Sequence, residues 1–167
     1  RNVTGVQTCA LPILFWGAYE QAGSTLNLFA DRYTRLDVLG FTFPSSWLQT
    51  AQPIFVIILA PVLAALWVRL GSRDPSLGVK FSIGLFAMGL SFLILVPAGA
   101  LAQSGADVRV SPMWLVASYF MSEIGELCIN PVGMSAVTRL SPTRIVGIMM
   151  GVWFLSISFG KIGRAHV

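Results

Sequence analysis

Hydrophobic residues fill five long stretches of the chain, and short polar segments separate them. The stretches cover residues 14–30, 47–68, 79–102, 112–138 and 145–160. Each approaches or exceeds the roughly 20 residues with which an apolar helix crosses a bilayer. The pattern predicts an all-α fold, a polytopic membrane bundle of five transmembrane helices.

The composition supports this interpretation. Hydrophobic residues make up 55% of the 167 positions and charged residues only 11%, with a mean hydropathy of +0.76. Soluble domains carry about 25% charged residues, so a soluble domain of this size is excluded. None of the segments between the stretches is long enough to hold a soluble catalytic domain.

The two ends of the chain differ from the rest. Residues 1–13 look like the translated reverse complement of a common sequencing adapter, and residues 161–167 look like its forward strand. We therefore expect both segments to be non-native and residues 14–160 to be a fragment of a longer membrane protein.

This exclusion removes several apparent signals. The one histidine, His166, lies in a suspect segment, so we predict no histidine-based metal site or catalytic triad. Cys9 is removed as well, which leaves Cys128 without a disulfide partner. Of the net charge of +4, three units come from Arg1, Lys161 and Arg164. A nucleic-acid partner is therefore not predicted.

Basic residues are unevenly distributed between the two sides of the predicted bundle. Five flank the second and fourth loops: Arg69, Arg73, Lys80, Arg139 and Arg144. Three lie on the other side: Arg32, Arg35 and Arg109. Loops rich in lysine and arginine stay in the cytoplasm, so we place the second and fourth loops there.

Glycine and proline positions predict local features of these helices. The spacing of Gly147 and Gly151 favours close approach of a neighbouring helix. Four prolines each remove a backbone donor and are expected to loosen the helix one turn before them: Pro53 and Pro61 in the second stretch, Pro97 in the third and Pro131 in the fourth.

Polar residues form a stripe on two of the predicted helices. In the first stretch they recur at steps of four, three and four: Glu20, Ser24, Asn27 and Asp31. The fourth stretch repeats the same spacing: Tyr119, Glu123, Glu126 and Asn130. At 3.6 residues per turn each set occupies one helix face. Two such faces are enough to line part of a water-filled cavity.

Carboxylates inside a membrane span favour a functional role. Burying an ionised acid costs roughly 2.5 to 3.5 kcal/mol on insertion scales, and such residues usually face a path for protons, ions or polar solutes. The alternative is that the polar groups only hydrogen-bond between helices. For Glu123, a structural or lipid-headgroup role is a further alternative.

A membrane-embedded enzyme is another alternative, with Glu123 and Glu126 as paired acids for general acid and base work. The native part of the chain has no HExxH and no GxSxG motif, so neither a zinc hydrolase nor a serine hydrolase is supported. We therefore do not expect an enzyme.

Three segments resemble a known family. FWGAYEQAGSTLNLFA at 15–30 resembles the seventh helix of the proton-dependent oligopeptide transporters, a branch of the major facilitator superfamily. GELCINPVGMS at 125–135, continuing through VTRLSP at 137–142, resembles their tenth helix. GIMMGVWFL at 147–155 resembles the start of their eleventh helix.

The resemblance implies helices seven to eleven of a twelve-helix protein that couples uptake of di- and tripeptides to inward proton movement by alternating access. It implies that Glu126 contributes to binding the peptide amino terminus and to proton coupling, and that Glu20 takes part in gating. Trp153 matches a tryptophan that lines a side-chain pocket. Gln52 stands where many members have an asparagine associated with the peptide carboxylate. We add Asn27 to the candidate substrate-binding residues and Glu123 to those for proton coupling.

The partners implied are peptides, protons, the lipid bilayer and a missing N-terminal six-helix bundle. No cofactor is expected, because the proton gradient drives transport. The short third loop favours a bacterial protein, in the inner membrane. Another substrate, such as nitrate or an amino-acid conjugate, stays open. Since this segment has no basic residue deep in a span, the fragment alone should not transport.

Overall fold

The structure is a computed structural model, and it describes residues 13–38, 41–105 and 108–162. The first stretch forms a helix over residues 13–19, the 3-10 turn η1 (Glu20–Gly23) and α2 (Thr25–Tyr33). The second forms α3 (Ser46–Gln49) and α4 (Ala51–Leu70), and the 3-10 turn η2 (Gly71–Arg73) follows. The remaining stretches form single helices: α5 (Leu77–Gln103), α6 (Met113–Leu140) and α7 (Val146–Ile162). The all-α fold with five helical segments is confirmed.

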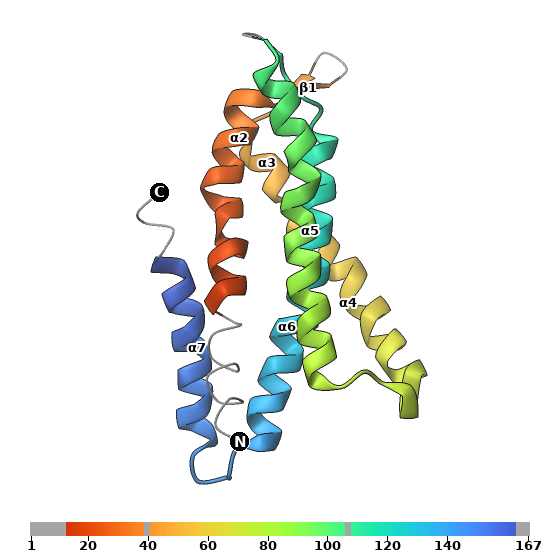
Figure 1. Ribbon diagram of the computed structural model, residues 1–167, viewed down its shortest axis with the longest axis vertical. Coiled ribbons are helices and arrows are strands. Elements are labelled where there is room, and N and C mark those ends of the chain that lie inside the picture. The colour runs from red at the N-terminus through yellow and green to blue at the C-terminus, as the bar shows by residue number, and fades with distance from the viewer. Residues whose placement is uncertain (1–12, 39–40, 106–107, 163–167) are drawn as a thin grey trace.

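The helices run along the long axis of the molecule, and α4 tilts away from the others at one end (Figure 1). The most extensive helix contact joins α5 to α6. A small hairpin of β1 (Asp37–Val38) and β2 (Phe41–Thr42) lies in the first loop. The suspected adapter segments lie almost entirely outside the described residues.

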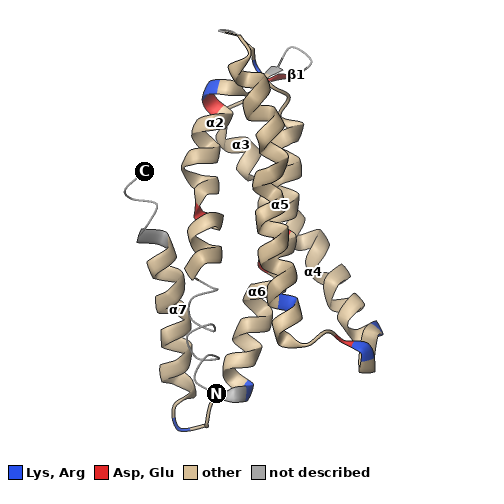
Figure 2. Ribbon diagram, in the orientation of Figure 1, with Lys and Arg blue, Asp and Glu red and all other residues tan. Residues whose placement is uncertain are grey.

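The first and third loops meet at one end of the bundle. Thr34 and Val110 form a parallel bridge, in which Arg35 N donates to Val110 O and Val110 N donates to Tyr33 O, each at 2.8 Å. The α4–α5 and α6–α7 connections lie at the opposite end, and charged residues gather at the two ends (Figure 2). This agrees with the predicted alternation of helix direction. Which end faces the cytoplasm stays a prediction.

Two apolar clusters hold the helices together. One joins residues 13–19 to α5, α6 and α7 through Phe15, Trp16, Phe81, Met88, Ile129 and Trp153. The other joins η1 and α2 to α3 and α6 through Ala22, Leu26, Ala30, Leu48, Leu115 and Tyr119. Both clusters include residues near position 20, so the first stretch is fixed against α6 on each side of Glu20.

The outward face of α4 is apolar. Its exposed side chains include Ile54, Ile57, Ile58, Val62, Leu66 and Val68. Among the described residues, Ser46–Arg73 and Leu77–Gln103 are long and apolar enough to cross a membrane, and Val146–Gly160 is a shorter apolar helix. An exposed surface of this kind fits a lipid environment.

Two local details differ from the sequence predictions, and one agrees with them. Position 24 leaves the helical region, with φ −120° and ψ −87°, so the regular period of the first stripe is broken between Glu20 and Ser24. The second stretch is interrupted at Thr50, three residues before Pro53, so the loosening predicted at this proline is confirmed. No described atom outside the helix's own backbone comes within 4 Å of a Cβ built on Gly147 or Gly151.

Candidate functional site

Tyr19 joins the first membrane stretch to the two acids of α6. Its hydroxyl group lies 2.9 Å from Glu123 Oε1 and 3.0 Å from Glu126 Oε2, within hydrogen-bond range of both. The ring is held in place because it stacks on Phe15 at 5.8 Å and meets Trp16 edge-on at 5.3 Å. Both aromatic neighbours belong to the apolar core, so the phenol is presented to α6 from a fixed position.

The two acids differ in exposure. Glu123 is completely buried, at 0% exposure, whereas Glu126 is half-buried. Asn130 Nδ2, one turn further along α6, donates to Glu126 Oε1 at 3.5 Å. The predicted lipid-headgroup alternative for Glu123 is therefore wrong, because this side chain is enclosed by the protein.

The predicted polar face of α6 divides into two parts. Glu123, Glu126 and Asn130 belong to the cluster around Tyr19. Tyr119 is 1% exposed within an apolar cluster, and its hydroxyl has no hydrogen-bond partner among the described residues. A shared helix face is therefore not enough to place four side chains in one site.

Gln52 approaches the same cluster from α4. Its side chain is near enough to interact with the Glu123 carboxyl group. By strict geometry, however, Gln52 Nε2 and Glu123 Oε2 each lack a hydrogen-bond partner among the described residues. The Gln52 amide therefore approaches the Glu123 carboxyl group without completing a hydrogen bond.

The polar residues of the first stretch surround its helix break. The Gln21 side chain donates to Gly17 O at 3.4 Å and accepts from Ser24 Oγ at 3.3 Å and Thr25 Oγ1 at 2.6 Å. These contacts replace part of the regular helix bonding and stabilise η1.

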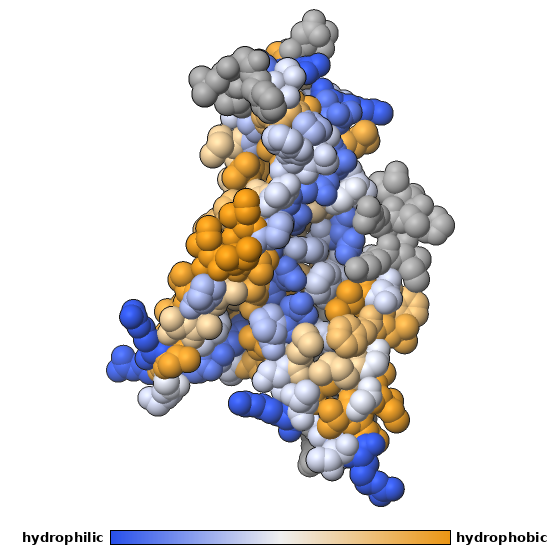
Figure 3. Space-filling model, turned by 180° about the vertical axis from the view of Figure 1, so that it is seen from behind, coloured by the Kyte–Doolittle hydropathy of each residue, from blue (hydrophilic) through white to orange (hydrophobic). Residues whose placement is uncertain are grey.

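Glu20 begins this turn and is half-buried, and Asn27 follows on α2 with its Oδ1 buried and unpaired among the described residues. Seen from behind, a band of polar and weakly polar surface runs between apolar flanks (Figure 3).

Trp153 lies in the core rather than beside the acids. Its ring is 4% exposed, meets Phe81 edge-on at 6.5 Å, and covers Gly133 so closely that a Cβ there would overlap it. Its indole nitrogen is buried with no hydrogen-bond partner among the described residues. The structure does not bring Trp153 together with Glu126, and its substrate role stays a prediction.

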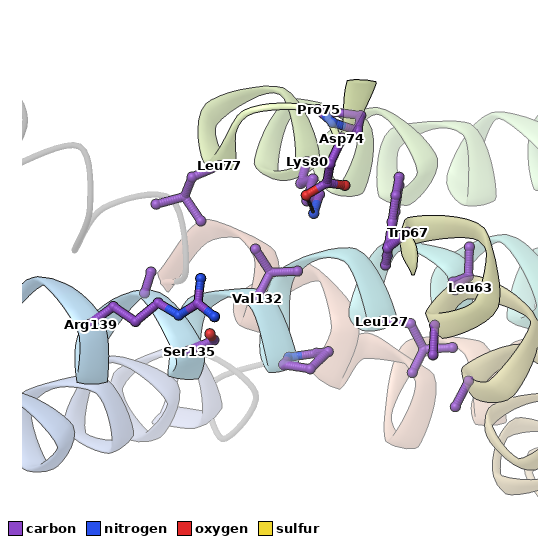
Figure 4. A pocket seen from close by; sticks show the side chains of 14 residues that line it. Leu63, Trp67, Asp74, Pro75, Leu77, Lys80, Leu127, Val132, Ser135 and Arg139 are labelled. Carbon is purple, nitrogen blue, oxygen red and sulfur yellow. Dashed lines mark hydrogen bonds and ion pairs between the residues drawn. The ribbon is translucent and has the colours of Figure 1, made fainter. Parts of the chain in front are cut away.

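A cavity of about 610 Å³ opens between α4, the start of α5 and the second half of α6 (Figure 4). Lys80 Nζ and Asp74 Oδ2 form an ion pair there at 2.7 Å, and Lys80 also lies over the Trp67 ring at 4.6 Å. Arg139 lines the same cavity, and Leu127 and Pro131 form part of its wall on α6. The two acids of α6 are not among its lining residues.

Sequence reasoning missed Tyr19 and the ion pair of Lys80 with Asp74. Tyr19 carries a usable signal, because a phenol inside an apolar stretch needs a hydrogen-bond partner when buried. The Lys80 pair has a weaker signal: Lys80 counts among the basic residues that predict orientation, and Asp74 lies six positions before it in the sequence.

An apolar helical bundle that encloses two carboxyl groups bridged by a phenol is typical of membrane proteins that move protons or polar solutes. Comparison with known proteins agrees. The profile of the POT family (PTR2) matches residues 4–167, so the chain belongs to the POT family. The predicted family is confirmed, and the membership favours a transporter of the major facilitator superfamily over the enzyme alternative.

Individual relatives give the same result. The chain is 45% identical over 155 residues to an uncharacterized transporter of Bacillus subtilis, YclF, covering 93% of this chain and 31% of the relative. It is 36% identical over 159 residues to the di-/tripeptide transporter of Lactococcus lactis subsp. cremoris, covering 93% and 32%. The crystal structure of a peptide transporter POT in complex with sulfate matches with a TM-score of 0.86 and 42% identity, covering 98% and 33%. The chain thus spans about a third of the length of these relatives.

Proposed function

We propose that this chain forms helices seven to eleven of a proton-coupled symporter for di- and tripeptides that works by alternating access. The observation that carries the proposal is the pair of carboxyl groups, Glu123 and Glu126, held inside the bundle by Tyr19. Family membership and the printed names of the relatives supply the substrate class. The rest of the transporter, including an N-terminal six-helix bundle, completes the peptide site.

Glu126 is the residue best placed to meet a peptide. It is half-buried and so keeps part of its surface open to a solute, and an ionised carboxylate pairs strongly with the ammonium group of a peptide amino terminus. Asn130 supports this side chain from one helical turn away. Gln52, Asn27 and Trp153 are the remaining candidates for contacts with the peptide.

Proton coupling follows from moving a charge relative to a carboxyl group. Desolvation favours the protonated form of an acid, and a nearby cation favours the ionised form. If the N-terminal bundle brings basic residues close to Glu20 and Glu126 in only one of the two gate states, proton binding depends on which gate is open. We place the protein in the inner membrane of a bacterium.

Uptake by the complete transporter tests this function. The protein is reconstituted in proteoliposomes, and uptake of a labelled dipeptide is measured with and without an inward proton gradient. We expect accumulation only with the gradient, and loss of accumulation in Glu126→Gln with unchanged insertion. Competition by unlabelled tripeptide, nitrate or an acylated amino acid identifies the substrate class. Gradient-independent uptake, or inhibition by nitrate and not by peptides, would refute the peptide symporter.

A further inference from the structure

A single hydroxyl group lies between two carboxyl groups in this site. Tyr19 Oη carries one proton, yet it is 2.9 Å from Glu123 Oε1 and 3.0 Å from Glu126 Oε2. A phenol donates one hydrogen bond and accepts others, so it cannot donate to both acids at the same time. The two contacts are both hydrogen bonds only if one of the carboxyl groups carries a proton and donates it to Tyr19.

Two ionised acids are unfavourable here for a second reason. Because their oxygen atoms touch one hydroxyl, they lie within about 6 Å of each other, where like charges disfavour double ionisation. Among the described residues, the groups that act on Glu123 are Tyr19, Glu126 and Gln52, and none is a cation. The ion pair of Lys80 with Asp74 involves neither acid.

Burial decides which acid keeps the proton. Glu123 is 0% exposed, and its charge would have neither water nor a cation to stabilise it. The rest of the transporter cannot touch a side chain that this segment already encloses. Glu126 is half-buried and accepts a hydrogen bond from Asn130, so it is the better site for the negative charge.

We propose that Glu123 and Glu126 share one proton through Tyr19, and that the proton rests on Glu123 while ionised Glu126 binds the ammonium group of the substrate. The hydrogen bonds then run in one direction, from Glu123 Oε1 to Tyr19 Oη and from Tyr19 Oη to Glu126 Oε2. Glu123 Oε2 remains a free acceptor among the described residues, and the Gln52 amide approaches the same carboxyl group. The substrate part of this assignment rests on the proposed function, whereas the position of the proton does not.

This arrangement separates two tasks that a single acid cannot perform together, since a protonated carboxyl group no longer pairs with an ammonium ion. The proton can still move between the acids. As the Glu123 proton passes to Tyr19 Oη, the original Tyr19 proton passes to Glu126 Oε2. Tyr19 is restored, and the cluster keeps one negative charge throughout.

Infrared difference spectroscopy of the complete, peptide-free transporter near neutral pH tests the position of the proton. We expect the carboxylic C=O stretching band to persist in Glu126→Gln and to disappear in Glu123→Gln. Tyr19→Phe should shift the band, because Glu123 loses its acceptor. The matched control is Tyr119→Phe, which removes a hydroxyl group without a described hydrogen bond and should leave the band unchanged.

Loss of the band in Glu126→Gln but not in Glu123→Gln would overturn the assignment, as would no change in either variant. If the band changes as expected but the complete protein transports no peptide, the position of the proton stands and only the proposed function is rejected. A transport measurement adds an independent readout. Glu123→Gln should lose gradient-driven accumulation but keep peptide exchange without a gradient, and loss of exchange as well would contradict the division of tasks.

Discussion

Gly84 on α5 and Gly125 on α6 bring the two helix backbones into contact. A Cβ atom at position 125 would lie 2.8 Å from the Gly84 carbonyl oxygen and 3.2 Å from the Phe15 ring. Residue 125 directly precedes Glu126 and follows Glu123 by two positions. Position 125 therefore lies against both α5 and the segment that carries Tyr19.

Gly125→Ala should destabilise the complete transporter. The added methyl group meets backbone rather than a flexible side-chain end, so α5 and α6 must separate, at a cost of about 1 to 3 kcal/mol. The measurement is the thermal unfolding temperature of the purified protein. Gly89→Ala is the matched control on α5, where no described atom outside the helix's own backbone lies within 4 Å of a new Cβ. Equal unfolding temperatures for the two variants would show that the crossing is not tight.

Asp74→Asn should destabilise the end of the bundle at which α4 connects to α5. The Lys80 side chain is only 11% exposed, so removing its partner leaves a largely buried ammonium group at a cost of about 1 to 3 kcal/mol. Unfolding temperatures of Asp74→Asn, Lys80→Met and the double variant measure this. We expect the double variant to be more stable than Asp74→Asn alone. If the two single losses simply add, the ion pair has no energetic coupling.

Most of the fold was predictable because the bilayer imposes a length on each apolar stretch. The predicted span at 79–102 became α5 (Leu77–Gln103), and the one at 112–138 became α6 (Met113–Leu140). The helix break at Ser24 was not predictable, since it depends on local competition for hydrogen bonds. The Gln21 side chain forms hydrogen bonds with Gly17 before η1 and with Thr25 after it. The spacing of hydrophobic residues gives no indication of such contacts.

The site was predictable in part. The spacing of Glu123 and Glu126 placed both acids on one face, and the structure brings both to Tyr19. Their unequal burial was not predictable, because it depends on which neighbours cover each side chain. Tyr119 illustrates the same limit: it shares their helical period but packs into an apolar cluster.

Side-specific labelling should confirm the orientation predicted from basic residues. In a cysteine-free background, Ser72→Cys, after α4, should react with a membrane-impermeant maleimide only in permeabilised cells. Ser104→Cys, after α5, should react in intact cells, since both serines are exposed and lie at opposite ends of α5. If Ser72→Cys reacts in intact cells and Ser104→Cys only in permeabilised cells, the predicted cytoplasmic side is wrong.

Coupled movement of peptide and proton is the central claim, and it is tested most directly by a pH-sensitive dye trapped inside proteoliposomes that contain the complete transporter. With a membrane potential negative inside and no initial pH gradient, external dipeptide should acidify the lumen. Glu126→Gln, reconstituted to the same density, should give no acidification. Peptide entry without acidification in the wild type, or full acidification by Glu126→Gln, would contradict the account.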